Sequence, residues 1–251
     1  MRIRTAVILL LSLGSTGLCH AQESPILNAD DVITKLIDHN GQRDKLGGGY
    51  TGSRRYVFEN RHFDKRAEML VSVKCDPDGT KHFEVLSEQG WKSANKRVLR
   101  KMLESEAETS RPQMRPMNSL NLDNYHFEML GSDLLEARPT YIIQALPKRQ
   151  DKYLIEGRIW VDAEDFAVVR VEGKPAKNPS FWTRSIHFVQ QYHKSGTFWF
   201  PLSTESVTDA RIFGKTEVTI SYFDYQPNSA AALSASEKSD FQQIEANHAH
   251  N

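Results

Sequence analysis

Residues 157–173 read GRIWVDAEDFAVVRVEG, and this stretch decides the interpretation of the whole chain. Its two halves, 159–161 and 166–171, are rich in β-branched and aromatic residues, which favour strands. The polar run between them contains no glycine or proline. Asp162 can start a turn there, because its carboxylate accepts hydrogen bonds from backbone amides two residues further on. The stretch therefore predicts a β-hairpin in the middle of a large antiparallel sheet.

Further strands are expected along most of the chain. Before residue 90 they are 50–60, 67–75 and 81–88, and the sequence DPDG at 76–79 is a strong turn signal between the last two. After residue 125 the expected strands are 125–130, 140–147, 153–162, 167–173, 183–193, 198–209 and 216–226. Their spacing, with turn signals between them, implies antiparallel connections. Ten strands in one sheet would curl, so the predicted fold class is mainly β, with a barrel or half-barrel shape.

Two segments have helical periodicity instead. The first begins at Asn28 or Asp30, ends at three glycines near residue 47, and has an apolar stripe made of Val32, Ile33, Leu36 and Ile37. An amphipathic helix of this kind needs a partner, and a sheet face is the expected one. The second covers 93–110 and is followed by 111–122, which has two prolines, no period, and is expected to be a loop.

The two ends of the chain differ from this pattern. A short basic start, an apolar run over 5–18 and a small residue at Ala21 predict a signal peptide over residues 1–21, cleaved after Ala21. The alternatives are a membrane anchor, against which polar and glycine residues in the run argue, and a lipoprotein signal acylated at Cys19. At the other end, 228–251 is polar, with little to bury, and predicts a disordered tail. One domain is therefore expected over residues 22–227.

The composition excludes a collagenous chain and a wholly disordered one. Hydrophobic residues make up 39% and charged residues 25%, as in ordinary globular chains. A formal net charge of zero gives no indication of nucleic acid as a partner. Without the signal peptide, Cys75 is the only cysteine, so no internal disulfide is expected and Cys75 is interpreted as a buried apolar residue.

We recognise no motif that would carry out chemistry. The chain lacks G-x-S-x-G, H-E-x-x-H and the P-loop pattern, and its histidines are scattered singly. Asp162, Glu164 and Asp165 are close together, but neighbouring carboxylates in a turn are usually solvated. The sequence therefore predicts a protein that is not an enzyme and has no metal site and no cofactor.

Aromatic residues gather in the last third of the chain and suggest a different use for the sheet. A sheet of this width that curls around a lumen can hold an apolar ligand, and burial stabilises acyl chains by roughly 0.8 kcal/mol per methylene. Strand parity predicts the lumen residues Ile159, Val161, Val169, Val171, Ile186, Phe188, Val218 and Ile220. Phe181 and Trp182, in a proline-flanked loop, are interpreted as a rim contact or as a loop anchor.

The runs KYLIEGRIWVDAEDFAVVRVEGKPAKNPSFW (152–182) and SVTDARIFGKTEVTISYFDYQ (206–226) add a family resemblance. Together with the strand that ends in Trp160-Val161-Asp162, they resemble the bacterial outer-membrane lipoprotein-sorting proteins, relatives of LolA and LolB, over about residues 29–227. The resemblance implies a half-open antiparallel β-barrel whose open face is covered by α-helices. It also implies a periplasmic carrier that binds acyl chains of lipoproteins or other lipids without chemical change.

The cargo stays open, because the classical carriers are shorter and the loop over 175–182 is not part of their general pattern. A lipoprotein, a free lipid or another amphiphile would fit. The expected partners are membrane-anchored donor and acceptor proteins, without nucleic acid, and the protein is expected to be a monomer. The alternatives are a lipid-sensing periplasmic regulator of envelope stress and an exported hydrolase.

Overall fold

The computed structural model describes residues 27–181, 183–211 and 214–228, so the predicted signal peptide and most of the predicted tail lie outside the described residues. All ten expected strands are found within these ranges. They are β1 (Tyr50–Asn60), β2 (Lys65–Cys75), β3 (Lys81–Gly90), β4 (Tyr125–Leu135), β5 (Arg138–Pro147), β6 (Ile155–Asp162), β7 (Val168–Pro175), β8 (Thr183–Ser195), β9 (Phe198–Ala210) and β10 (Gly214–Pro227).

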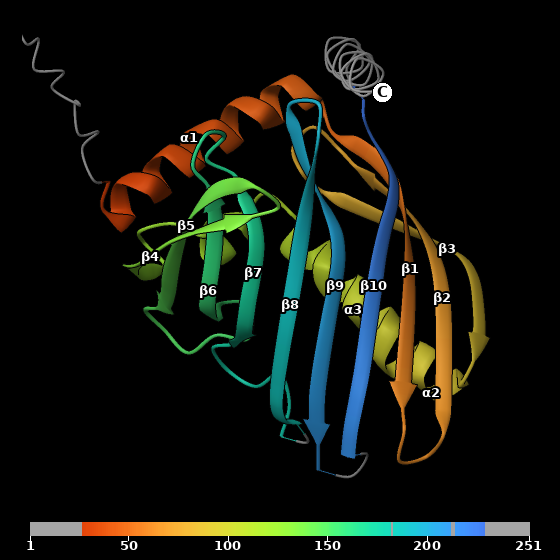
Figure 1. Cartoon of the computed structure of the whole chain (residues 1–251). Helices are drawn as coiled ribbons and strands as arrows, with labels where there is room; N and C mark the ends of the chain where they lie inside the picture. The colour runs from red at the N-terminus through yellow and green to blue at the C-terminus, as the bar shows by residue number, and fades with distance from the viewer. Residues whose placement is uncertain (1–26, 182, 212–213, 229–251) are drawn as a thin grey trace, which may run out of the picture.

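The strands form one curled, open sheet in the order β3-β2-β1-β10-β9-β8-β7-β6-β5-β4 (Figure 1). Every neighbouring pair is antiparallel. The two edge strands, β3 and β4, do not pair with each other, so the barrel is half-open and the predicted fold class is confirmed. The order follows from one long-range pairing, in which β1 lies beside β10 and joins the two ends of the described chain.

The hairpin that decided the interpretation is β6–β7, and its turn is built as expected. The Asp162 carboxylate accepts hydrogen bonds from the backbone amides of Glu164 (3.0 Å) and Asp165 (2.8 Å). The hairpin does not lie in the middle of the sheet, however, because only β5 and β4 lie beyond it on one side. The first three strands extend the other side, since they attach to β10 and not to β4.

A bulge in this hairpin also shifts the side-chain parity. Ile159 pairs with Val171 and Trp160 with Arg170, but Val161 pairs with Val168. One extra residue in β7 therefore changes which side chains share a face, as bulges do. The rule of simple alternation fails at this point of the strand.

Helix α1 (Ala29–Gly47) is capped by Asn28, one of the two capping residues expected from the sequence. The Asn28 side chain accepts from the backbone amide of Asp31 at 2.9 Å, and the Asp31 carboxylate accepts from the Asn28 amide at 3.4 Å, which is a capping box. The helix ends at Gly48, whose φ of 60° is in the left-handed region that favours glycine. No helix among the described residues is long and apolar enough to cross a membrane.

The predicted helical segment over 93–110 is interrupted. It consists of α2 (Lys92–Ala94), a π-helical turn (Asn95–Leu99) and α3 (Arg100–Thr109). The expected loop over 111–122 contains a further short helix, α4 (Arg115–Asn118). Its proline lies in the first turn, where the missing N–H costs no intrahelical hydrogen bond, so the prolines did not exclude a helix.

This segment has a structural task that follows from the sheet order. β3 and β4 are consecutive strands at opposite edges, so residues 91–124 must cross from one edge to the other. Figure 1 shows α3 running across one face of the sheet. The helices therefore lie over the open face of the half-barrel, as expected.

Two apolar clusters hold the helices on the sheet. Under α1, Ala29, Val32, Ile33 and Leu36 pack against buried residues of β5 to β7, namely Ile143, Ile159, Val161 and Val171. Near α3, Leu99 and Leu103 pack against β1, β2 and β10, with buried side chains that include Tyr56, Phe58, Met69, Val218 and Ile220. Ile37, expected in the first stripe, is 41% exposed, so that stripe is narrower than expected. Cys75 is buried, as expected.

Candidate ligand-binding cavity

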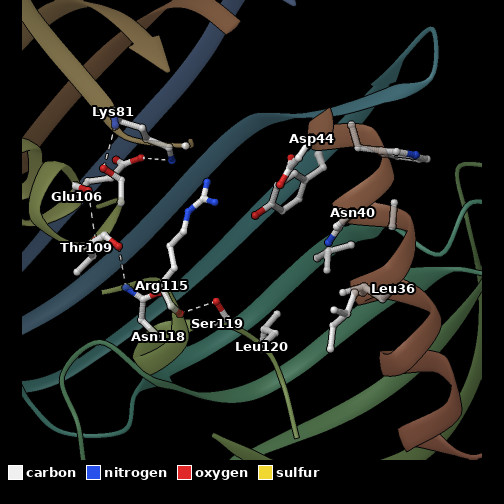
Figure 2. A pocket seen from close by; sticks show the side chains of 18 of the residues that line it. Leu36, Asn40, Asp44, Lys81, Glu106, Thr109, Arg115, Asn118, Ser119 and Leu120 are labelled. Carbon is white, nitrogen blue, oxygen red and sulfur yellow. Dashed lines mark hydrogen bonds and ion pairs between the residues drawn. The ribbon is translucent and has the colours of Figure 1, made fainter. Parts of the chain in front are cut away.

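A cavity of about 700 Å³ lies between α1, the α3–α4 segment and the sheet. Sites for small molecules commonly have volumes of roughly 300–1,000 Å³, so the cavity is large enough to hold one. Figure 2 shows α1, with Leu36, Asn40 and Asp44, facing the α3–α4 segment across it.

The walls of the cavity differ in polarity. One wall is mainly apolar or aromatic, although α1 also contributes Asn40 and Asp44 to it. Its apolar and aromatic side chains come from α1, the sheet with the β6–β7 turn, and Leu120, and they are Leu36, Ile37, Leu120, Ala167, Val168, Tyr192 and Trp199. The wall formed by α3 and α4 is polar, with Thr109, Ser110, Asn118 and Ser119, and reaches Lys81, Glu106 and Arg115 at its end. The cavity is therefore amphiphilic, in contrast to the wholly apolar lumen expected from the sequence.

An ion cluster of three residues closes the polar end. Glu106 on α3 accepts from the Arg54 guanidinium on β1 at 2.7 Å and from the Lys81 ammonium on β3 at 2.7 Å. Arg54 is 1% exposed, and its Nε donates to the hydroxyl of Tyr225 at 2.8 Å. The guanidinium Cζ also lies 5.2 Å from the ring centre of Phe83 and 4.9 Å from that of Tyr222. These contacts compensate the burial of the charge.

The pKa values keep the cluster charged. Burial alone would raise the pKa of Glu106, but the attraction of Lys81 and Arg54 outweighs it and lowers that pKa to about 2. Burial opposes the charged form of Lys81 as well, and the neighbouring Glu106 carboxylate outweighs it and raises the pKa of Lys81. At neutral pH the cluster therefore holds two positive charges and one negative charge.

Arg115 lies beside the cluster and points into the cavity in Figure 2. Its guanidinium packs against Gly79, where an added Cβ would come within 1.2 Å of Nη2. Gly79 has a φ of 84°, which favours glycine, and the missing Cβ leaves the space that the Arg115 guanidinium occupies. Within the described ranges, the Arg115 guanidinium makes neither a hydrogen bond nor an ion pair with the protein.

The predicted lumen residues lie mostly in the two apolar clusters. Ile159, Val161 and Val171 are fully or almost fully buried under α1, and Phe188 is half-buried at the edge of that cluster. Val218 and Ile220 belong to the cluster near α3. Ile186 is half-buried on β8. Side chains of the protein therefore fill the space beside these residues.

The remaining predicted residues lie elsewhere. Val169 lines a second cavity of only about 40 Å³, while its neighbour Val168 lines the larger one, because of the bulge. Phe181 is 73% exposed, and the guanidinium Cζ of Arg211 lies 4.7 Å from its ring centre. Trp182 lies outside the described residues. None of the nine described candidates lines the larger cavity.

The polar end of the cavity was not predicted from the sequence, although the sequence contains one signal for it. Arg54 alternates with Tyr56 and Phe58 on β1, and Lys81 alternates with Phe83 and Val85 on β3. A charge at an inward position of an alternating strand has to find a partner. No pattern in the sequence pointed to Arg115. In the described part of the chain, no three His, Cys, Asp or Glu side chains are grouped so that they could hold a metal ion.

Solved structures with a similar fold include three bacterial proteins. The first is a DUF1329 family protein from Desulfovibrio piger, with 10% identity, coverage of 79% of this chain and 92% of that chain, and a TM-score of 0.42. The second is a putative outer membrane lipoprotein-sorting protein domain from Vibrio parahaemolyticus, with 10% identity, coverage of 79% and 92%, and a TM-score of 0.40. The third is a LolA superfamily protein from Nitrosomonas europaea, with 10% identity, coverage of 81% and 95%, and a TM-score of 0.38. Two of them come from the group that the sequence resembles. At such identities and scores the likeness carries no argument about function.

A search of curated proteins finds no match. One family, described as a family of unknown function (DUF5686), matches residues 90–228. The match runs from the end of β3 to the residue after β10 and includes the cavity wall made by α3 and α4. Because it spans more than half of the chain, the protein belongs to the DUF5686 family.

Proposed function

We propose that this protein is a non-enzymatic carrier or binding protein for an acyl-chain amphiphile. The observation that carries the proposal is the cavity of about 700 Å³, in which an apolar wall faces a polar wall that ends in charges. An amphiphile has the same division between tail and head. Its tail would be held by burial against Leu36, Ile37 and Val168, which requires no bond to be made or broken.

Helix α1 is the cover of the site in this proposal. Its first half is anchored by Val32, Ile33 and Leu36, which are buried. Its second half extends along the cavity and is tied by Arg43, which donates to the backbone oxygens of Asp165 (2.9 Å) and Phe166 (3.1 Å). Release of this half would widen the cavity without disturbing the sheet.

Such an opening would also expose part of the predicted lumen. Ile159, Val161 and Val171 lie directly under α1, so they are the next apolar surface that a long tail would reach. In this proposal they contact the ligand only when α1 moves. Export to the periplasm, predicted from residues 1–21, and exchange of cargo with membrane-anchored proteins complete the proposed role.

The experiment uses Gly41, a residue of α1 that lines the cavity. An added Cβ there meets no atom within 4 Å, so a side chain can start at this position without a clash, and a large one would take up space that the ligand needs. Gly41→Trp is expected to weaken binding of a fluorescent fatty acid at least tenfold. Gly41→Ala is the matched control, since it raises helix propensity by about 1 kcal/mol without filling the cavity. It is expected to bind as the unchanged protein does.

Two results would contradict the proposal. If no fatty acid binds and native mass spectrometry of the exported protein detects no lipid, the protein is not a lipid carrier. If Gly41→Trp and the unchanged protein bind equally well, the ligand does not occupy this cavity. Thermal unfolding of both variants shows whether either has lost its fold.

A further inference from the structure

The polar end of the cavity has an excess of positive charge beside Glu106. Arg54 and Lys81 both form ion pairs with the Glu106 carboxylate, so one negative charge is shared by two positive charges. Arg115 is a third cation at the same end, and in the described ranges its guanidinium makes no hydrogen bond or ion pair. The hydrogen bond from the Thr80 amide lowers the pKa of the nearby Asp78, and the charge of Arg115 lowers it to a smaller extent. The cavity has one more acid, Asp44, which lies on α1 across from this end in Figure 2.

The position of Arg115 is built by the turn between β2 and β3. Gly79 in this turn leaves the space that the Arg115 guanidinium occupies. Lys81, two residues later, is the first residue of β3. A single short segment therefore supplies one cation and the space for the other. A guanidinium that lines a cavity without a protein partner can bind an anionic group of a ligand.

We infer that this end of the cavity binds the anionic headgroup of the amphiphile, through carboxylate or phosphate oxygens. This inference rests on the proposed function. The planar fork of Arg115 can donate two parallel hydrogen bonds to such a group, and Lys81 contributes a second positive charge. The tail then extends toward Leu36, Ile37 and Val168 at the apolar wall.

The test compares ligands with the same sixteen-carbon tail and different heads: hexadecanoate, hexadecyl phosphate, hexadecan-1-ol and hexadecyltrimethylammonium. Affinities are measured by displacement of a bound fluorescent fatty acid, with each competitor kept below its solubility limit or micelle concentration. The two anions are expected to bind at least tenfold more tightly than the alcohol, and the cation most weakly. Whichever anion binds more tightly identifies the head as carboxylate or phosphate.

Variants then assign the preference to a residue. Arg115→Gln is expected to remove the tenfold preference for anions and to leave the affinity for the alcohol unchanged. Arg115→Lys keeps the charge but loses the fork, so it is expected to restore part of the preference. Arg111→Gln removes an exposed arginine that precedes α4 and is expected to change nothing.

Each other outcome has a definite meaning. If the unchanged protein binds the alcohol as tightly as the anions, the headgroup site is wrong and the carrier proposal stands. If the preference survives in Arg115→Gln, the assignment to Arg115 is wrong. If inorganic phosphate binds as tightly as hexadecyl phosphate, the site binds a free anion and the headgroup inference fails. If no sixteen-carbon compound binds, both proposals fail.

Discussion

The contacts between helix and sheet differ in their side chains at the two helix-covered ends of the sheet. Under α1, the contact with β5 to β7 is made by aliphatic side chains such as Ile33, Ile159 and Val161. Near α3, the contact with β1, β2 and β10 also contains aliphatic and aromatic side chains, but Arg54 is buried among them. The helix contact at the α1 end is aliphatic, and its polar ties lie at the rim, where Arg43 bonds the β6–β7 turn and Arg138 pairs with the buried Asp162. At the α3 end, a charge lies within the contact itself and depends on its partners.

The contrast indicates which end of the molecule is more sensitive to substitution. An apolar contact tolerates changes of shape at moderate cost, whereas a buried charge is stable only while its partners remain. The charged end borders the polar wall of the cavity and the aliphatic end borders the apolar wall. The amphiphilic character of the cavity thus follows directly from the contrast between the two ends.

The largest effect is expected at the charged end. Glu106→Gln leaves Arg54 and Lys81 without a counter-charge, so we expect the free energy of unfolding at pH 7 to fall by about 3–5 kcal/mol. Urea unfolding measures it. The control is Glu104→Gln on the same helix, which breaks an exposed ion pair with Lys101 and is expected to cost below about 0.5 kcal/mol. Equal losses of unfolding free energy in the two variants would show that the cluster stabilises the fold no more than an exposed ion pair does.

The same variant has a pH dependence with a defined sign. The pKa of Glu106 is about 2 in the folded protein, against an ordinary value of 4.5. Because the folded pKa is the lower one, the contribution of Glu106 is fully present above about pH 4.5 and is lost as the pH falls towards 2. The difference in stability between the unchanged protein and Glu106→Gln should therefore shrink over this window.

A smaller effect is expected at the aliphatic end. Ile33 is fully buried under α1, so Ile33→Ala should lower the free energy of unfolding by about 2–4 kcal/mol, equally at pH 4 and pH 7. Ile37→Ala is the matched control, because Ile37 is 41% exposed and one turn further along the helix. It should cost below about 1 kcal/mol. Similar losses for both would mean that the whole stripe is packed.

The smallest effect on stability is expected at the tie of α1. Arg43→Ala removes two hydrogen bonds to backbone oxygens, and we expect a loss of about 1 kcal/mol. The clearer result should be local: amide hydrogens in the second half of α1 should exchange faster, while those near Ile33 stay unchanged. Lys45→Ala, in the last turn of the same helix, is the control. Unchanged exchange in Arg43→Ala would show that Arg43 does not hold this half.

Local patterns explain how much of this fold was predictable. Alternation located all ten strands, and capping and glycine residues located both ends of α1, because these signals act over a few neighbouring residues. Strand ends were less accurate: β4 continues past a bulge to Leu135 instead of ending near residue 130. Bulges such as those in β4 and β7 have no clear signal in the sequence. Simple alternation therefore predicted that Val169 lines the cavity, whereas its neighbour Val168 does so in the structure.

The candidate site was less predictable than the fold. Parity identified inward-facing residues such as Ile159 and Val218, but whether an inward side chain meets empty space or a helix depends on the path of residues 91–124. That path is set by the sheet order, and Lys81, Glu106 and Arg115 meet only because the chain crosses from one edge to the other.

Patterns in the sequence located the ten strands to within a few residues, narrowed the start of α1 to Asn28 or Asp30 and placed its end at the glycines near residue 47. They also predicted a barrel or half-barrel, and the family resemblance implied the half-open form. Three features depend on the three-dimensional arrangement: β1 pairs with β10, α1 and α3 cover the two ends of the open face, and the remaining space is amphiphilic. The difference lies in how far apart in the sequence the interacting residues are. Periodicity and caps are properties of adjacent residues, whereas the cavity depends on side chains that only the folded sheet brings together.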